Sequence, residues 1–353
     1  MQTHANTLST LAVQGTPFEV GRQLGQFGAA AVHGYLLQSS AWATVQAWKG
    51  SSQAQAMAQL TRERFPLIWT ELEGLASGLG LPLDDVFLWN ARGDFWAMAP
   101  DGCTTLLLPG KAVRQIAHNE DGDPGFTGQC AIAECRIDGG ASFASFIYPG
   151  SLPGHTLAVT DAGLAMTVNN IRGLHVAVGV PRMVLTRALL DTGSVAQAVK
   201  VLEASPRSGA FHLSLADCHS GQIASVEFSA YGCSVIPVVN PMLHANHAIH
   251  PDMRDYPQII TGSSGHRQIR GNQLLDQHQV QARELDCLQI LGDTADPVFP
   301  IYRQQADDSD HENTHATADI RITSDGIAWQ VYEHPQQPAR ITLHNGRLVS
   351  VGD

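Results

Sequence analysis

The chain has 353 residues, of which 44% are hydrophobic and 15% are charged, and its formal net charge is −12. This composition is that of a globular protein long enough for one large domain or two ordinary ones, and it excludes a disordered chain. Because no cluster of Lys and Arg offsets the acidity, neither nucleic acid nor an anionic membrane surface is expected as a partner.

The first hundred residues are predicted to be mainly helical. Apolar residues recur at helical spacing, and Gly and Pro mark the expected ends of the helices. The predicted helices cover residues 15 to about 37, 41–59, 62–79 and 82 to about 92.

Short segments bounded by Gly and Pro follow residue 102 and predict a fold rich in strands. Strands are expected at 104–108, 113–118, 130–137, 142–148, 155–160 and 164–169, then helices at 182–191 and 194–204. Strands at 211–217, 223–228, 233–239 and 243–245, a helix at 267–275, and strands at 318–323, 327–333 and 339–343 complete the chain. This order predicts a layered α+β fold with stacked sheets between helices. The polar stretch 304–313 is interpreted as a solvated surface loop.

Cys103 lies between Gly102 and two threonines, where the predicted strands begin. A thiol reacts as its thiolate, and a free cysteine has a pKa of about 8.5, so a base must activate it. If the peptide bond before Cys103 were cut, the new α-amine, with a reference pKa of about 7.7–8.0, would suit that task. Gly102 has no Cβ and leaves its carbonyl open to the thiol. Alone, the pattern is weak, because a cysteine in a strand is commonly a small buried hydrophobic residue.

Further motifs occur in order along the chain: GTPFEVG at 15–21, EGLASG at 73–78, WNARGD at 89–94, DGCTT at 101–105, HNED at 118–121, GLAMTVNN at 163–170, PRMVLTR at 181–187 and HANH at 244–247. Together they resemble the acyl-coenzyme A:6-aminopenicillanic acid acyltransferase family, which are self-processing cysteine enzymes among the N-terminal-nucleophile (Ntn) hydrolases. The resemblance implies an α+β, four-layer αββα sandwich. It also implies one globular domain made of an N-terminal segment, 1–102, and a catalytic chain, 103–353.

The resemblance also implies roles for single residues. Cys103 would be the nucleophile in self-cleavage after Gly102 and in turnover. Asp121 would orient the freed α-amine, and Asn246 would donate a hydrogen bond to the developing oxyanion. Arg267 would lie near Cys103 and lower the pKa of its thiol. The residues expected to line the substrate site are Thr105, Asn119, Glu120, Asn169 and Asn170.

The function implied is hydrolysis of the amide bond of a small N-acylated amine or amino acid, through a thioester on Cys103 and without a cofactor. Glu120 stands where the penicillin-forming relative has an aromatic residue, and an acid there could receive a substrate ammonium group, which makes β-alanyl amides one candidate class. The alternative is an acyl-coenzyme A-dependent N-acyltransferase, which is less favoured because no basic cluster for coenzyme A phosphates is evident. The expected partners are this small amide and the cleaved N-terminal segment.

Two readings from other classes remain. His311 and His315 fit the HExxH pattern of zinc hydrolases, which requires a helix that the polar surroundings do not predict. A zinc site from His244, His247 and His250 is equally disfavoured, so no metal is expected. A non-catalytic binding scaffold is the other alternative, and the intact Cys103 argues against it.

The cysteines and the N-terminus bear on the compartment. Six cysteines are scattered without a CxxC pair, which is typical of a reduced intracellular protein. The segment from Met1 to Asn6 shows neither the basic nor the apolar region of a signal peptide. No window approaches the roughly 20 apolar residues of a membrane-spanning helix. A cytoplasmic protein is therefore expected, with no membrane partner.

Overall fold

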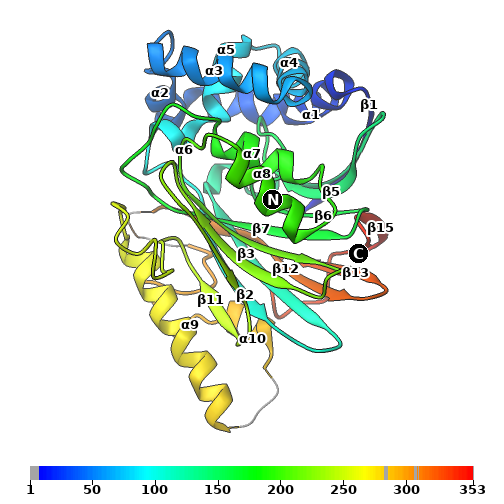
Figure 1. The fold of residues 1–353 in the computed structure, drawn as a ribbon, viewed down its shortest axis with the longest axis vertical. Coiled ribbons are helices and arrows are strands. Elements are labelled where there is room, and N and C mark those ends of the chain that lie inside the picture. The colour runs from blue at the N-terminus through cyan, green and yellow to red at the C-terminus, as the bar shows by residue number, and fades with distance from the viewer. Residues whose placement is uncertain (1–7, 282–284, 306–307, 309, 353) are drawn as a thin grey trace, which may run out of the picture.

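The computed structural model describes residues 8–281, 285–305, 308 and 310–352, and it places two stacked β-sheets between helical layers (Figure 1). Eight strands form one sheet, in the order β1-β4-β5-β6-β7-β8-β9-β10, and seven form the other, in the order β11-β2-β3-β12-β13-β14-β15. Within each sheet, neighbouring strands are antiparallel except for the parallel pair β1 and β4. The predicted α+β sandwich is confirmed.

The eight-stranded sheet contributes one inner face of the sandwich. Its strands are β1 (Ser9–Gly15), β4 (Ala131–Ile137), β5 (Ser142–Ile147), β6 (Leu157–Thr160), β7 (Leu164–Asn170), β8 (Phe211–Asp217), β9 (Ile223–Phe228) and β10 (Cys233–Pro237). Strand β1 was not predicted, because it is one short strand at the start of a helical region.

The seven-stranded sheet carries Cys103. Its strands are β2 (Gly102–Leu108), β3 (Arg114–Gly122), β11 (Met242–His244), β12 (Asn313–Thr323), β13 (Gly326–Tyr332), β14 (Ile341–His344) and β15 (Arg347–Val351). Successive side chains of a strand point to opposite faces. Leu107 and Ile116 accordingly pack in the large core shared with the other sheet, whereas Leu106 and Ala117 pack in a smaller core with α9 and α10.

Two helical layers cover the sheets (Figure 1). The eight-stranded sheet is covered by α1 (Pro17–Gly34), α2 (Ser40–Gln46), α3 (Ser52–Arg64), α4 (Pro66–Leu79), α5 (Leu83–Trp89), α6 (Arg92–Phe95), α7 (Arg182–Leu189) and α8 (Val195–Ala204). The seven-stranded sheet is covered by α9 (Gly262–Gln281) and α10 (Cys287–Leu291). Within the described residues, no helix is both long and apolar enough to cross a membrane.

The glycines of two N-terminal motifs have a structural role, the close packing of α1 on α4. A Cβ atom at Gly21 would lie 2.0 Å from the carbonyl oxygen of Glu71, and one at Gly74 would lie 2.0 Å from that of Phe18. The two helix backbones therefore touch directly, and a larger side chain at either position would push them apart.

Several predicted boundaries differ from the structure. The predicted helix 41–59 is two helices, α2 and α3, because Gly50 adopts a positive φ of 77° between them. Helix α4 begins at Pro66, where proline suits a first helical turn, rather than at residue 62. Helix α9 is longer than predicted, and α10 and β15 were not predicted at all, since both are short and carry weak periodicity.

The interpretation of 304–313 as a solvated loop is wrong for three of its acidic residues, although Gln304, Gln305 and His311 are exposed. Asp308, Asp310 and Glu312 are turned inward, with side chains at most 3% exposed. The guanidinium of Arg303 donates to both carboxylate oxygens of Asp308, at 2.9 Å each, and lies 3.3 Å from Glu312. Acidic residues were taken as solvent-facing because acids are rarely buried unless paired, and their arginine partners, Arg303 and the distant Arg172, lie outside this stretch.

Candidate active site

Cys103 is the second residue of β2 and is only 4% exposed. Its backbone N–H donates to Oδ1 of Asn246 at 2.9 Å, and its carbonyl oxygen accepts from Nη1 of Arg267 at 2.6 Å. Both predicted partners therefore hold the backbone of Cys103 from the side of β11 and α9.

Arg267 is fully buried and connects four groups around Cys103. Besides the Cys103 carbonyl, it donates to Thr104 Oγ1 at 2.7 Å, to Asn246 Oδ1 at 2.7 Å and to Ser263 Oγ at 3.1 Å. These donors fix the amide orientation of Asn246, because Oδ1 must be the acceptor.

The oxyanion role expected for Asn246 requires its Nδ2 group. In this structure Nδ2 donates to the main-chain carbonyl of Asn170 at 3.2 Å. Asn246 thus lies beside Cys103, and its side-chain donor is bound to the carbonyl at the end of β7.

The thiol of Cys103 is shifted toward its protonated form. Burial raises its pKa well above the usual value, and the nearby charges of Glu120, Asp121 and Asp101 raise it further. Arg267 was expected to lower this pKa, but its guanidinium bonds to the Cys103 carbonyl and not to the sulfur. In the continuous chain burial and three carboxyl groups raise this pKa, and the effect of Arg267 on the thiol stays a prediction.

Glu120, on β3, is paired with Cys103 of the neighbouring strand β2, and its side chain contacts the Cys103 thiol. The Cys103 Sγ donates to Oε2 of Glu120 at 3.7 Å, the same Oε2 lies 3.1 Å from Nε2 of His118, and Tyr148 donates its hydroxyl to Oε1 at 3.1 Å. Burial raises the pKa of Glu120 well above its usual value and lowers that of His118 to about 3. Both shifts favour the neutral forms, in which the Glu120 carboxyl would donate a hydrogen bond to Nε2 of His118.

The sequence pointed to Glu120 but not to His118 or Tyr148. His118 had a signal, because residues two apart in a strand share a face. Tyr148 had none, since it follows β5 of the other sheet and reaches Glu120 only through the stacking of the sheets.

Cys103, His118 and Glu120 also form a group with ligand atoms suited to zinc. One atom of each lies within 4.8 Å of the others. Hydrogen bonds among the three account for their closeness. We assign no metal to them.

Asp121 points to the other face of β3, toward α9. Its Oδ1 accepts from Thr314 at 2.6 Å, while Oδ2 is buried without a hydrogen-bond partner in the described part of the chain. Burial raises its pKa, and the charges of Arg267 and Arg303 oppose that rise. Asp121 is paired across the strands with Gly102 and so lies beside the bond that precedes Cys103.

Glu312 also lies against Gly102. A Cβ atom at residue 102 would stand 2.0 Å from its Oε2. The carboxyl group accepts from Arg172 at 2.9 Å and from Arg303 at 3.3 Å, yet burial raises its pKa to about 7. Glu312 was not predicted for the site, because its segment was interpreted as a surface loop.

The segment that leads into Gly102 is held by polar side chains. Asn170 donates to the carbonyl of Asp101 at 3.1 Å, and Arg92 pairs with the Asp101 carboxylate at 2.8 Å. Arg172 donates to the carbonyl of Ala99 at 3.0 Å. Asn170 is thus beside the predicted cleavage point.

Three other predicted substrate residues have their side chains bonded away from the Cys103 thiol. Asn119 faces the outer helical layer, where Nδ2 donates to the carbonyl of Leu291 at 2.8 Å. Thr105 and Asn169 bond to each other at 2.7 Å between the sheets. All three are fully buried, so they shape the fold around the site.

The metal readings of the histidine motifs do not fit the geometry. Around His311 and His315 the backbone is a turn followed by β12, not a helix, and Glu312 between them is paired with arginines. The zincin reading is therefore wrong. The ring nitrogens of His244, His247 and His250 are hydrogen-bonded to Glu227, Ser264 and Ser225 respectively, and His250 also lies 3.9 Å from Glu227.

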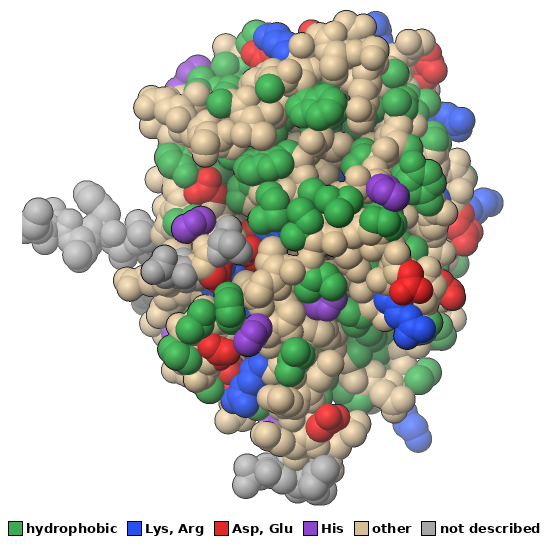
Figure 2. All heavy atoms as spheres, turned by 90° about the vertical axis from the view of Figure 1, so that its left-hand side faces the viewer, with side chains coloured by type: hydrophobic (Ala, Val, Ile, Leu, Met, Phe, Trp, Pro, Cys, Tyr) green, Lys and Arg blue, Asp and Glu red, His purple; other side chains and the backbone are tan. Residues whose placement is uncertain are grey.

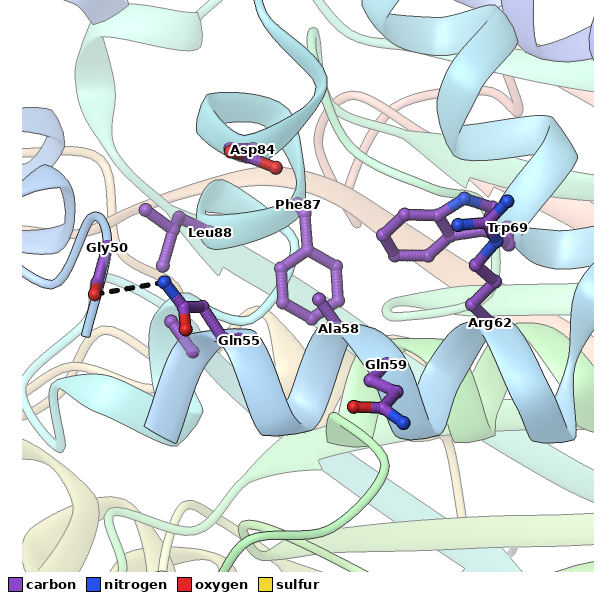
Figure 3. A pocket seen from close by; sticks show the side chains of 10 residues that line it. Gly50, Gln55, Ala58, Gln59, Arg62, Trp69, Asp84, Phe87 and Leu88 are labelled. Carbon is purple, nitrogen blue, oxygen red and sulfur yellow. Dashed lines mark hydrogen bonds between the residues drawn. The ribbon is translucent and has the colours of Figure 1, made fainter. Parts of the chain in front are cut away.

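Surface features lie apart from Cys103. Figure 3 shows a pocket among α3, α4 and α5 that Arg62, Trp69 and Phe87 help to line, and no candidate residue borders it. Figure 2 shows apolar side chains gathered over the upper part of one face, with charged ones mainly toward its margins and lower part. Neither feature bears on the chemistry of the thiol.

Comparison with known proteins agrees with the geometry. The sequence model of the family described as acyl-coenzyme A:6-aminopenicillanic acid acyl-transferase matches residues 109–337, a range that includes Asp121, Asn246 and Arg267 and begins just after Cys103. Over 333 residues the chain is 24% identical to the beta-alanyl-dopamine/carcinine hydrolase of Drosophila melanogaster, covering 83% of this chain and 85% of that relative. The chain belongs to the acyl-coenzyme A:6-aminopenicillanic acid acyltransferase family, and it is an enzyme that acts on amides as a hydrolase or acyltransferase.

Proposed function

We propose that this protein is a self-processing cysteine amidohydrolase that cuts its own chain between Gly102 and Cys103 and then hydrolyses a small N-acylated amine. The main observation behind the proposal is the pair of hydrogen bonds to the Cys103 backbone. Asn246 accepts from its N–H and Arg267 donates to its carbonyl, on either side of the reactive side chain. The division into segments 1–102 and 103–353 is part of this proposal.

Self-cleavage begins with attack of the Cys103 sulfur on the Gly102 carbonyl carbon. The C–N bond breaks, the Cys103 nitrogen gains a proton and becomes an amine, and Gly102 is left as a thioester. Water then hydrolyses the thioester, which restores the thiol and gives Gly102 a carboxyl group. Asn246 Oδ1, which now accepts from the Cys103 N–H, would accept from the new amine and hold it beside the sulfur.

Turnover repeats this chemistry on an external amide. The freed α-amine takes the thiol proton, the sulfur attacks the substrate carbonyl, and the amine product leaves with a proton. Water then releases the acyl group. Hydrolysis is favoured over transfer from coenzyme A, because the site arginines Arg92, Arg172 and Arg303 are already paired with carboxylates.

The surroundings of Gly102 indicate which acyl group the site accepts. Because Gly102 is the acyl donor in self-cleavage, the space around it becomes the acyl subsite once the cut segment moves away. Glu312 and Asp121 lie directly against it, and Glu120 lies against the sulfur. The two carboxyl groups that lie against Gly102 favour a short acyl chain that carries an ammonium group, such as β-alanyl. The name of the Drosophila relative, a β-alanyl amide hydrolase, supports the same class.

The processing step is tested by intact-mass measurement and denaturing gels of the purified chain. The wild type should separate into pieces of 102 and 251 residues (353 − 102), and Cys103→Ala should remain whole. Cys130→Ala, at another buried cysteine, is the matched control and should be cut normally. A wild type that stays whole under all conditions would disprove self-processing.

The substrate class is tested by comparing β-alanyl-histamine with propionyl-histamine, which lacks only the ammonium group. The proposal expects a kcat/KM at least about 100-fold higher for the β-alanyl compound, since the propionyl compound cannot form the ion pair with the acids beside Gly102. Equal values would remove the amino-acyl class while leaving the amidohydrolase proposal intact.

A further inference from the structure

Self-cleavage poses a chemical problem that turnover does not. In the continuous chain the nitrogen of Cys103 is an amide that donates to Asn246, so no α-amine exists to take the proton from the thiol. The thiol is also buried, which raises its pKa and prevents spontaneous loss of the proton. Another acceptor must be within reach of the sulfur.

We propose that His118, acting through the carboxyl group of Glu120, accepts the thiol proton of Cys103 during self-cleavage. The inference rests on the proposed function, because it concerns the first step of that processing. Cys103 Sγ and His118 Nε2 meet at the same oxygen, Oε2 of Glu120, at 3.7 and 3.1 Å. All three side chains are buried, so the path is shielded from water.

The hydrogen bonds behind His118 fix which ring nitrogen is free to accept. Nδ2 of Asn169 donates to the carbonyl of His244 at 3.1 Å, so Oδ1 of Asn169 is an acceptor and takes the hydroxyl proton of Thr105 at 2.7 Å. The Thr105 oxygen must then accept from Nδ1 of His118, which lies 2.7 Å away. This leaves the lone pair on Nε2, directed at Glu120.

The proton movements balance without any outside reactant. The thiol proton passes to Oε2 of Glu120 as the proton already on Oε2 passes to Nε2 of His118, so the carboxyl stays neutral. The result is a thiolate and an imidazolium, whose opposite charges stabilise each other in the dry interior. When the thiolate attacks Gly102, the imidazolium proton returns by the same oxygen to the leaving nitrogen of Cys103.

Other titratable groups lie close enough to this pair to influence its protonation. They are Asp101 before β2, Asp121 on β3, Cys130 before β4, Tyr148 after β5 and His212 on β8. Tyr148 donates to the other oxygen of Glu120, which keeps Oε2 directed at Cys103 and His118. His118 thus receives the proton of the thiol through Glu120, without touching the sulfur itself.

The test compares self-cleavage rates of the full chain from pH 5 to 8 for the wild type, His118→Gln and Glu120→Gln. With an internal acceptor the wild-type rate should be nearly independent of pH. Both variants should be cut about 100-fold more slowly near neutral pH, within the range for loss of a general base. Their rates should also rise about tenfold per pH unit, because the thiolate must then form by loss of its proton to solvent.

A matched control and the possible outcomes separate this inference from the proposed function. His155→Phe removes another buried histidine, whose ring also contacts Tyr148 and whose Nδ1 bonds to the Leu152 carbonyl, and it should keep the wild-type profile. A wild type that is not cut refutes the proposed function itself. A wild type that is cut, with His118→Gln and Glu120→Gln matching its rate and flat profile, refutes the role of His118 alone. If one variant fails to fold, as judged by circular dichroism, the other decides.

Discussion

The carboxyl group of Glu312 lies against the α-carbon of Gly102, so close that a Cβ atom at residue 102 would stand 2.0 Å from Oε2. The same Cβ would lie 3.3 Å from Cβ of Asp121. Glycine at this position is therefore required by the packing of two buried acids and not by a left-handed backbone. Gly102 and the two acids packed against it therefore form one structural unit next to Cys103.

The first prediction concerns Gly102→Ala. The added methyl group must displace Glu312 from its arginine partners, so we expect a loss of roughly 1–3 kcal/mol of stability and self-cleavage at least about tenfold slower. Urea denaturation and gel densitometry measure the two effects. Gly34→Ala is the control, because a Cβ there meets no atom within 4 Å. Cleavage of Gly102→Ala at the wild-type rate would show that Glu312 does not restrict this position.

The second prediction concerns Glu312→Gln and the acyl group. If the Glu312 carboxylate receives a substrate ammonium, the variant should raise KM for β-alanyl-histamine about 10- to 100-fold and leave propionyl-histamine nearly unaffected. Asp308→Asn is the matched control, since Asp308 pairs with the same Arg303, whereas the atoms nearest to a Cβ at Gly102 belong to Glu312 and Asp121. A parallel change for both substrates would point to general damage of the site.

The same carboxyl group predicts a pH effect on substrate binding. Burial raises the pKa of Glu312 to about 7 in the folded chain, so it ionises only as the pH rises through that value. KM for β-alanyl-histamine should therefore fall between about pH 6 and 8, and Glu312→Gln should remove this dependence. An unchanged profile in the variant would assign the effect to another group.

Local sequence signals predicted the sheets, the main helices and the position of Cys103 better than they predicted its surroundings. The predicted strand 113–118 ended before Glu120 and Asp121, and only the longer β3 of the structure places them on opposite faces. Glu312 could not be placed, because it reaches Gly102 only through the pairing of β12 with β3, in which Thr314 lies opposite Asp121. Pairing between strands so distant in sequence depends on the whole fold, and the polar residues around Glu312 hid it.

The fourth prediction concerns Arg267→Lys, which keeps the charge but loses the planar group that bonds to Cys103, Thr104 and Asn246 together. A lysine cannot supply these donors in the same geometry. We expect self-cleavage to slow by at least about tenfold, as measured by the appearance of the smaller piece over time. Arg270→Lys, on the same helix and paired with Asp293, is the control and should be cut normally. If charge alone mattered, both variants would behave like the wild type.

The last prediction concerns acid stability and His155. Burial lowers the pKa of His155 to about 4, below the value near 6.5 of an unfolded histidine. As the pH falls below about 6.5 the unfolded chain binds this proton and the folded chain does not, so stability is lost until the pH reaches about 4. The loss is about 1.4 kcal/mol per pH unit in that window, or about 3 kcal/mol in all.

His155→Phe keeps a ring beside Tyr148 and loses the hydrogen bond to the Leu152 carbonyl, a cost that does not depend on pH. Urea denaturation at about pH 7.5, 6 and 5 should therefore show the variant gaining on the wild type as the pH falls. Stability curves that run parallel would mean that His155 takes up its proton equally in the folded and unfolded chains.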